Sequence, residues 1–200
     1  MIGKKGTAAR RLDIIHTARD LFAEKNYYET KISDITKRLE ISQGTFYNYF
    51  KNKSDVFTYI IKVYIKRIEE IFLKENPELS NNAIEFRNQL VRLQNELFDV
   101  FIEDQKMYDI LFFRAEVAGL ETEKEVKKLF KTAELFIEKY LTHGVTKKFL
   151  RNSIDVSLNA KAIRGMTTVA LEDLMENGAP LQLKERWILS LSNFIIDGLS

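Results

Sequence analysis

Apolar residues recur at helical spacing through most of this 200-residue chain. Two prolines and eight glycines leave room for long helices and argue against a turn-rich β fold. The pattern therefore predicts an all-α protein of about nine helices. The expected ranges are about 8–25, 31–39, 43–50, 53–75, 82–103, 106–118, 123–143, 155–176 and 181–199.

Residues 30–57 read as two short helices joined by a tight turn and followed by the start of a long helix. Thr30 is expected to cap the first short helix, and Ser42 precedes the second. The turn between them contains Glu40. Asn52, with an aspartate three residues later, is expected to cap the long helix.

The second short helix separates an apolar side from a polar one. Phe46 and Phe50 are four residues apart and point inward. Amides and hydroxyls on a short helix held by an apolar core suit a helix that enters the major groove of DNA. The residues left to face outward are Gln43, Thr45, Tyr47, Asn48 and Tyr49.

This stretch resembles the signature of the tetracycline-repressor (TetR) family of bacterial regulators. The resemblance rests on residues 32–35 and 41–57, including the intact pattern G-T-x-Y-x-Y-F-x-x-K that begins at Gly44. The family usually has glycine in the turn where this chain has Glu40, and a non-glycine residue resists a positive φ. A small alanine is common where this chain has Thr36. The specific match covers about the first quarter of the chain.

The resemblance implies a division of roles among the polar residues. Base-edge contacts suit glutamine and asparagine, which can bind adenine bidentately, and threonine, which can touch a thymine methyl. The base-edge candidates are Gln43, Thr45 and Asn48. The phosphate candidates are Thr30, Lys31, Tyr47, Tyr49 and Lys53, with the helix N-terminus at Lys53 adding its dipole. Gly44 would allow close backbone approach, and packing beside Phe50 is the alternative role of Tyr49.

The charge distribution fits this interpretation. Residues 1–53 carry 11 Lys and Arg against 6 Asp and Glu, whereas residues 54–200 carry 20 against 23. The basic end is the end with the predicted helix-turn-helix, as attraction to phosphates requires. The expected domains are a DNA-binding domain over 1–53 and a helical effector-binding and dimerisation domain over 54–200.

Catalytic and metal-binding motifs are missing from the sequence. Two separated histidines and no cysteine provide neither a nucleophile–base pair nor clustered metal ligands, so we expect no enzyme activity and no cofactor. No run of eighteen apolar residues and no signal peptide are evident. A cytoplasmic protein without a membrane span is therefore expected.

Aromatic residues after the long helix begins are candidates for lining a ligand cavity, because the family bundles these helices around one. Plain core packing is the alternative. An apolar or amphipathic organic molecule is the expected ligand. The candidates are Tyr64, Phe98, Phe101, Tyr108, Phe112, Phe136 and Tyr140.

The last two helices are expected to form a homodimer, because in the family they pair with their counterparts across a twofold axis. Burial against the chain's own core is the alternative reading of the same apolar faces. The candidate interface residues are Ile163, Thr167, Ala170, Leu174, Trp187, Leu191 and Phe194.

Together these features predict a sequence-specific, DNA-binding transcriptional regulator. The expected form is a repressor that leaves a palindromic operator in double-stranded DNA when a small-molecule effector binds the C-terminal helices. The alternative is an architectural or site-marking DNA-binding dimer with no small-molecule effector.

Overall fold

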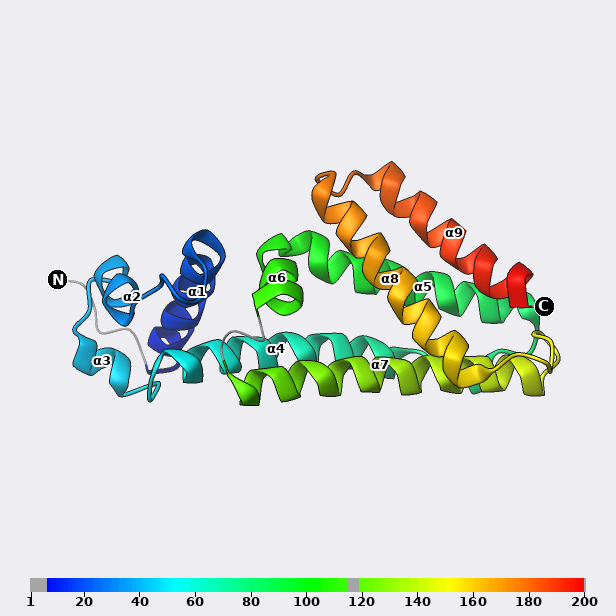
Figure 1. The fold of residues 1–200 in the computed structure, drawn as a ribbon, viewed down its shortest axis with the longest axis horizontal. Coiled ribbons are helices and arrows are strands. Elements are labelled where there is room, and N and C mark those ends of the chain that lie inside the picture. The colour runs from blue at the N-terminus through cyan, green and yellow to red at the C-terminus, as the bar shows by residue number, and fades with distance from the viewer. Residues whose placement is uncertain (1–6, 115–118, 200) are drawn as a thin grey trace. The chain divides into compact units, whose positions relative to one another are not determined.

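The computed structural model describes residues 7–114 and 119–199, and this part of the chain is helical without a β-strand. This confirms the all-α prediction. A 3₁₀ turn at Pro77–Leu79 and a π-helical turn at Ile110–Arg114 supplement the α-helices. The α-helices are α1 (Thr7–Lys25), α2 (Ile32–Arg38), α3 (Gln43–Tyr47), α4 (Lys53–Lys74), α5 (Ala83–Glu103), α6 (Gln105–Asp109), α7 (Leu120–Thr146), α8 (Val156–Glu176) and α9 (Leu181–Leu199) (Figure 1).

The chain divides into two compact units. The first contains residues 1–65 and 106–127, and the second contains residues 66–105 and 128–200. Helices α4 and α7 therefore contribute residues to both units. This division follows packing, whereas the predicted boundary at residue 53 concerns function and stays a prediction.

Local capping explains most of the helix starts. The Asn82 side chain accepts a hydrogen bond from the Glu85 amide at 2.9 Å, and α5 begins directly after it. Asp155 does the same for α8, accepting from the Leu158 amide at 2.9 Å. Both helices start within one residue of the predicted position, because a side-chain cap is encoded locally.

Thr122, with a glutamate three residues later, has the sequence pattern of a capping box, which predicts that the next helix begins at about residue 123. This prediction is wrong. Helix α7 begins at Leu120, and Thr122 lies inside its first turn with its side chain fully buried. The Thr122 hydroxyl lies 2.7 Å from the Thr58 hydroxyl of α4, so a partner distant in sequence replaces the expected local bond. The predicted end of the sixth helix at residue 118 lies outside the described residues.

In the first unit, α2 packs against both α1 and α3. The core contains Phe22, Ile35, Phe46 and Phe57, none of which is exposed to solvent. The rings of Phe22 and Phe57 meet edge to face with centroids 5.0 Å apart, which joins α1 to α4. Helices α1, α2 and α3 and the start of α4 thus share one apolar core.

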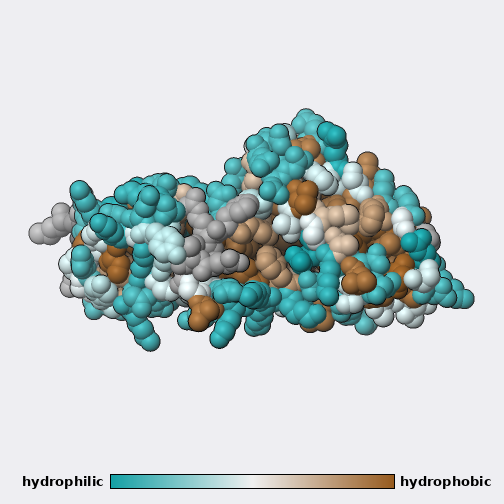
Figure 2. All heavy atoms as spheres, viewed as in Figure 1, coloured by the Kyte–Doolittle hydropathy of each residue, from teal (hydrophilic) through white to brown (hydrophobic). Residues whose placement is uncertain are grey.

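In the second unit, α5, α8 and α9 pack on one another. The contact between α5 and α9 includes two polar pairs: Lys184 Nζ lies 2.6 Å from Asp99 Oδ1, and the buried Gln94 Nε2 donates to Ser192 Oγ at 3.1 Å. In this view, polar side chains cover much of the surface, with apolar patches between them over the C-terminal helices (Figure 2). None of the described helices is long and apolar enough to cross a membrane.

The end of α7 depends on a close approach at Gly144. The amides of Phe149 and Leu150 donate to the Gly144 carbonyl at 2.8 and 3.1 Å, so the following connection folds back onto the helix. A Cβ atom at this position would lie 2.7 Å from Leu150 Cδ1 and 3.3 Å from Phe86 Cζ. No side chain fits there without displacing its neighbours.

Replacing Gly144 by alanine is expected to lower the free energy of unfolding by about 1–3 kcal/mol, because the added methyl group overpacks this contact. Gly198→Ala is the matched control, since a Cβ there would lie 3.8 Å from the nearest atom, which is ordinary contact. Urea unfolding followed by circular dichroism measures both variants. Equal stability of the two variants would contradict the close approach.

Candidate nucleic-acid interface

The turn between α2 and α3 is closed by backbone hydrogen bonds that force one residue into the left-handed region. The Glu40 amide donates to the Lys37 carbonyl at 3.2 Å, and the Ile41 amide donates to the Thr36 carbonyl at 3.0 Å. This is the Schellman arrangement of a helix C-terminus. Glu40 has φ +53°. The turn therefore has the geometry that favours glycine, although glutamate occupies it.

Helix α3 starts at a side-chain cap and is fixed by two buried rings. Ser42 Oγ accepts from the Thr45 amide at 3.1 Å and lies 2.9 Å from Thr45 Oγ1. Phe46 is fully buried and Phe50 is 2% exposed, with ring centroids 6.0 Å apart. The inward side predicted from the sequence is therefore the inward side of the structure.

The side chains predicted to read DNA bases lie on the other side of α3. Gln43 and Asn48 are exposed, and Thr45 is half-buried because its hydroxyl contacts the cap. Tyr47 is 52% exposed, and Tyr49 is half-buried. Gly44 is exposed, so its backbone is accessible. The surface of α3 thus displays two amides and one phenol to solvent.

Thr30 has a different role from the predicted one. Its side chain is fully buried, and its hydroxyl donates to the carbonyls of Leu21 at 3.1 Å and Asn26 at 2.6 Å. It neither caps α2 nor presents a hydroxyl to a phosphate. The cap comes from Asp34, whose carboxylate accepts from the Lys31 amide at 3.1 Å. This hydrogen bond, opposed by partial desolvation and supported by nearby Lys25, holds the pKa of Asp34 below its usual range.

Lys53 is also engaged within the protein. Its ammonium group donates to the carbonyls of Tyr27 at 2.7 Å, Tyr28 at 3.3 Å and Thr30 at 2.9 Å. It also lies 4.4 Å from the centre of the Tyr27 ring. Burial lowers the pKa of this lysine. The first residue of α4 therefore fastens the connection between α1 and α2, whereas Lys31, the other predicted phosphate lysine, is exposed.

The cap of α4 confirms the predicted role of Asn52. Its side chain accepts from the Asp55 amide at 2.8 Å, and the Asp55 carboxylate accepts from the Lys51 amide at 2.8 Å. Arg11 of α1 makes a contact that the sequence did not predict. Its guanidinium lies 4.0 Å from the centre of the Tyr59 ring, a contact for which 48 residues of separation leave no local signal.

The predicted ligand-lining aromatics belong to both units. Phe98, Phe101, Tyr108 and Tyr140 are buried, and Tyr64, Phe112 and Phe136 are half-buried. Tyr64, Tyr108 and Phe112 lie in the first unit, and the remaining four lie in the second. Their common function as a ligand lining therefore stays a prediction.

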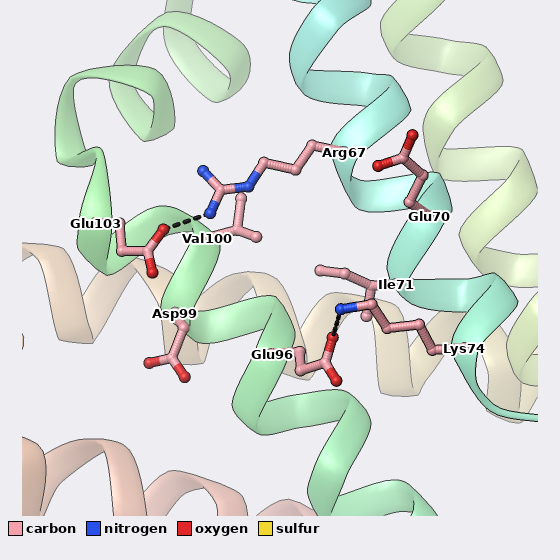
Figure 3. Close-up of a pocket in the computed structure, with 8 residues that line it drawn as sticks. All are labelled: Arg67, Glu70, Ile71, Lys74, Glu96, Asp99, Val100 and Glu103. Carbon is pink, nitrogen blue, oxygen red and sulfur yellow. Dashed lines mark hydrogen bonds and ion pairs between the residues drawn. The ribbon is translucent and has the colours of Figure 1, made fainter.

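A hollow of about 370 Å³ lies between α4 and α5 in the second unit (Figure 3). It contains none of the predicted aromatics. Ion pairs join Arg67 to Glu103 and Lys74 to Glu96 across it. Its lining is Arg67, Glu70, Ile71, Lys74, Glu96, Asp99, Val100 and Glu103. The described residues contain no cluster of three or more His, Cys, Asp or Glu that could hold a metal ion.

The predicted dimer residues divide between the inside and the surface of the second unit. Ile163, Ala170, Leu174 and Leu191 are buried within the chain, Thr167 and Trp187 are half-buried, and Phe194 is 43% exposed. The Trp187 indole donates to Asp173 Oδ2 at 2.6 Å. Other large apolar side chains face solvent on the same two helices. These are Leu158, Val169, Leu181 and Leu189.

Known proteins share this sequence pattern and this fold. Residues 14–60 match the family described as bacterial regulatory proteins, tetR family. The fatty acid metabolism regulator protein of Bacillus subtilis (strain 168) is 23% identical over 186 residues, which cover 93% of this chain and 91% of that protein.

Two solved structures extend the comparison to three dimensions. The regulator FadR from Bacillus subtilis, determined in complex with stearoyl-CoA, has a TM-score of 0.72 at 21% identity and covers 94% of this chain and 99% of that chain. A TetR-like transcriptional regulator from Rhodococcus sp. RHA1 has a TM-score of 0.78 at 19% identity, with coverage of 98% and 100%. The match extends over nearly the whole chain, well beyond residues 14–60.

Glu40→Gly is expected to raise the free energy of unfolding by about 1 kcal/mol, because glycine adopts the left-handed conformation without the Cβ penalty. Glu40→Ala is the control, since it removes the same carboxylate but keeps a Cβ atom. Thermal unfolding of the two variants separates backbone strain from charge. A similar gain in both variants would attribute the effect to the carboxylate instead.

Lys53→Met is expected to change the stability of the protein, whereas Lys31→Met is expected to change its affinity for DNA. The first removes three hydrogen bonds to carbonyls and should lower the free energy of unfolding by about 2 kcal/mol. The second removes an exposed charge and should leave stability within about 0.5 kcal/mol. Its expected effect is on DNA affinity, with the slope of log K against log salt reduced by about 1. If the Lys53→Met variant had the same free energy of unfolding as the wild type, the Lys53 ammonium group would not be stabilising this connection.

Proposed function

The chain belongs to the tetR family of bacterial regulatory proteins, and we propose that it is a homodimeric repressor of transcription. In this proposal it binds a palindromic DNA site and leaves it when a small apolar or amphipathic molecule binds the C-terminal helices. A DNA-binding transcriptional regulator is the class that the family provides. The dimer, the palindrome, the repression and the effector are the proposed details.

The display of polar side chains on α3 is the observation that carries the proposal. Phe46 is fully buried while Gln43 and Asn48 are exposed, so the helix presents carboxamides that can pair with base edges. Tyr47 is exposed beside them and suits a phosphate. Thr45 is placed for a thymine methyl, since its hydroxyl is turned toward Ser42.

Electrostatics supports the same surface. Residues 1–53 contain 11 basic and 6 acidic residues, which gives this end of the chain a net positive charge. Such a charge attracts phosphates at long range. Lys31 is exposed at the start of α2 and is available to a phosphate. Thr30 and Lys53 act indirectly, by fixing the connection from which α2 starts.

A twofold dimer is supported by the apolar side chains that α8 and α9 leave exposed. Val169, Leu189 and Phe194 are 53%, 56% and 43% exposed, which is costly for a surface that stays in water. Two copies joined through these helices would carry two reading heads. Such a pair matches a palindromic site, because the symmetry of the DNA then mirrors that of the protein.

The effector is supported by the relatives and by the aromatic content of the helices after α3. One relative is named as a fatty acid metabolism regulator, and one similar structure was determined with stearoyl-CoA. Release requires that the ligand bind the DNA-incompetent form more tightly, since equal affinity for both forms shifts nothing. An amphipathic ligand is the chemistry that aromatic walls favour.

The second candidate function is a DNA-binding dimer without an effector. It is favoured by the tight packing of Phe98 and Phe101, which are 0% and 1% exposed within the second unit. A bundle that is filled by its own side chains needs no ligand. The two functions differ in whether any small molecule releases the DNA.

The test is a salt series of binding to the DNA that flanks the protein's own coding region, compared with scrambled duplex. We expect preferred binding to a palindrome by one dimer, with affinity that falls steeply as salt rises. Absence of binding to either duplex at low salt would overturn the DNA-binding function.

Two variants test the roles on α3 in the same assay. Tyr47→Ala should weaken binding to specific and scrambled duplex alike, because a phosphate contact carries no sequence information. Asn48→Ala should lose about 1–3 kcal/mol of discrimination at particular base pairs. Equal losses of specific and non-specific binding in both variants would contradict this division of roles.

A further inference from the structure

Buried polar atoms without a hydrogen-bond partner occur at three side chains of the described residues: Gln89 Oε1, Gln94 Oε1 and the Tyr140 hydroxyl. Their residues are 5%, 9% and 2% exposed. Nearly all buried polar groups in proteins are paired, so each exception calls for a physical reason. All three belong to the second unit.

Tyr140 and Gln89 are linked through Phe86, which lies three residues before Gln89 on α5 and has its ring centroid 5.8 Å from that of Tyr140. The Gln89 amide nitrogen donates to the Asn76 carbonyl at 2.9 Å. The charges of Glu75 and Arg92 act on the Tyr140 hydroxyl, and these two residues form an ion pair with each other. Gln89 and Arg92 are three residues apart on α5 and so share a face. Gln94 differs, since its amide faces Ser192 of α9.

The Gln89 oxygen can only accept a hydrogen bond, whereas the neutral Tyr140 hydroxyl can donate one as well as accept one. The Gln89 nitrogen is oriented by the Asn76 carbonyl, which accepts only, so the oxygen of the same amide must point away as a free acceptor. Burial, followed by the nearby Glu75 charge, raises the pKa of Tyr140 well above its ordinary value. Its hydroxyl is therefore neutral at physiological pH and is a free donor.

The walls beside these two groups are aromatic. The Tyr140 ring lies 5.0 Å from the Phe136 ring and 5.8 Å from the Phe86 ring, measured between centroids. Phe136 in turn stacks on Phe72 at 4.6 Å. A molecule that reached this place would meet apolar faces around its body and two polar atoms at one end.

We infer that the Tyr140 hydroxyl and the Gln89 carboxamide oxygen bind the head group of the effector, and that this head is neutral and both accepts and donates a hydrogen bond. The inference rests on the proposed function, since it specifies the ligand of the same helices. The simplest such ligand is a long-chain alcohol, which accepts from Tyr140 and donates to Gln89.

Charge and hydrogen bonding disfavour a carboxylate and an ether at this place. A carboxylate accepts only, and it would face the free oxygen of Gln89 together with the acidic Glu75. An ether satisfies Tyr140 but leaves the Gln89 oxygen unpaired. Desolvating a group that remains unpaired is costly, so a site built from a donor and an acceptor discriminates strongly among heads.

The experiment measures binding of three probes with alkyl tails of similar length: 1-octanol, 1-methoxyoctane and octanoate. Isothermal titration calorimetry is carried out on the full-length wild type, Tyr140→Phe and the control Tyr59→Phe, which removes a hydroxyl in the other unit. We expect 1-octanol to bind the wild type and Tyr59→Phe about tenfold more tightly than 1-methoxyoctane or octanoate. Tyr140→Phe should lose about tenfold in affinity for 1-octanol.

Stability of the ligand-free protein separates this inference from a buried water. If the Tyr140 hydroxyl is unpaired without ligand, Tyr140→Phe should unfold at the same or a higher temperature than the wild type, because it removes an unsatisfied group. A Tm several degrees lower, with unchanged affinity for 1-octanol, would show that water satisfies the hydroxyl and would overturn the inference. Gln89→Met is a second test variant. We expect it to lose the preference for 1-octanol over 1-methoxyoctane in the same calorimetric titration.

Release of DNA distinguishes failure of the inference from failure of the proposed function. If all three probes release DNA equally from the wild type and Tyr140→Phe, the regulator is ligand-responsive but its head-group site lies elsewhere. If no probe binds the wild type, the inference is overturned, and the salt series on DNA still decides whether the protein is a regulator.

Discussion

The Lys53 ammonium group is the contact on which the DNA-binding unit depends. Its three donors meet the carbonyls of Tyr27, Tyr28 and Thr30, which belong to a connection without regular secondary structure. Those carbonyls have no helical partners of their own, and a single cation at the start of α4 satisfies them. Helix α2 begins directly after this connection, so its direction follows from where the lysine holds the chain. The charge costs desolvation, which is offset by the carbonyl dipoles around it.

The reading surface combines a fixed side with a strained turn. Phe46 and Phe50 bury the inner side of α3, which leaves the side-chain amides of Gln43 and Asn48 exposed. These exposed side chains are the ones available for the proposed contacts with DNA. Glu40 has a positive φ, which strains the backbone of the turn between α2 and α3.

The second unit contains polar groups of two kinds. Where α5 meets α9, the buried amide nitrogen of Gln94 donates to Ser192 Oγ at 3.1 Å, so this donor is paired within the chain. Near the end of α4, the Tyr140 hydroxyl and the Gln89 amide oxygen are buried without a hydrogen-bond partner among the described residues. A buried polar pair with its hydrogen bond formed fixes how two helices pack. A buried polar atom without a partner lowers the stability of the folded chain. The first pair therefore stabilises the packing of α5 on α9, and the second is the site that we propose for ligand recognition.

The sequence by itself determined the local features of this protein. It predicted the helix-turn-helix, the cap at Asn52 and the inward side of α3, because caps and helical periodicity act over three or four residues. Only the tertiary structure decided that Thr30 and Lys53 serve the connection between α1 and α2, since Thr30 contacts Leu21, 9 residues away, and Lys53 contacts Tyr27, 26 residues away. It likewise decided which apolar side of α8 and α9 is buried. Periodicity identifies an apolar stripe, but packing against other helices decides which stripe the protein buries.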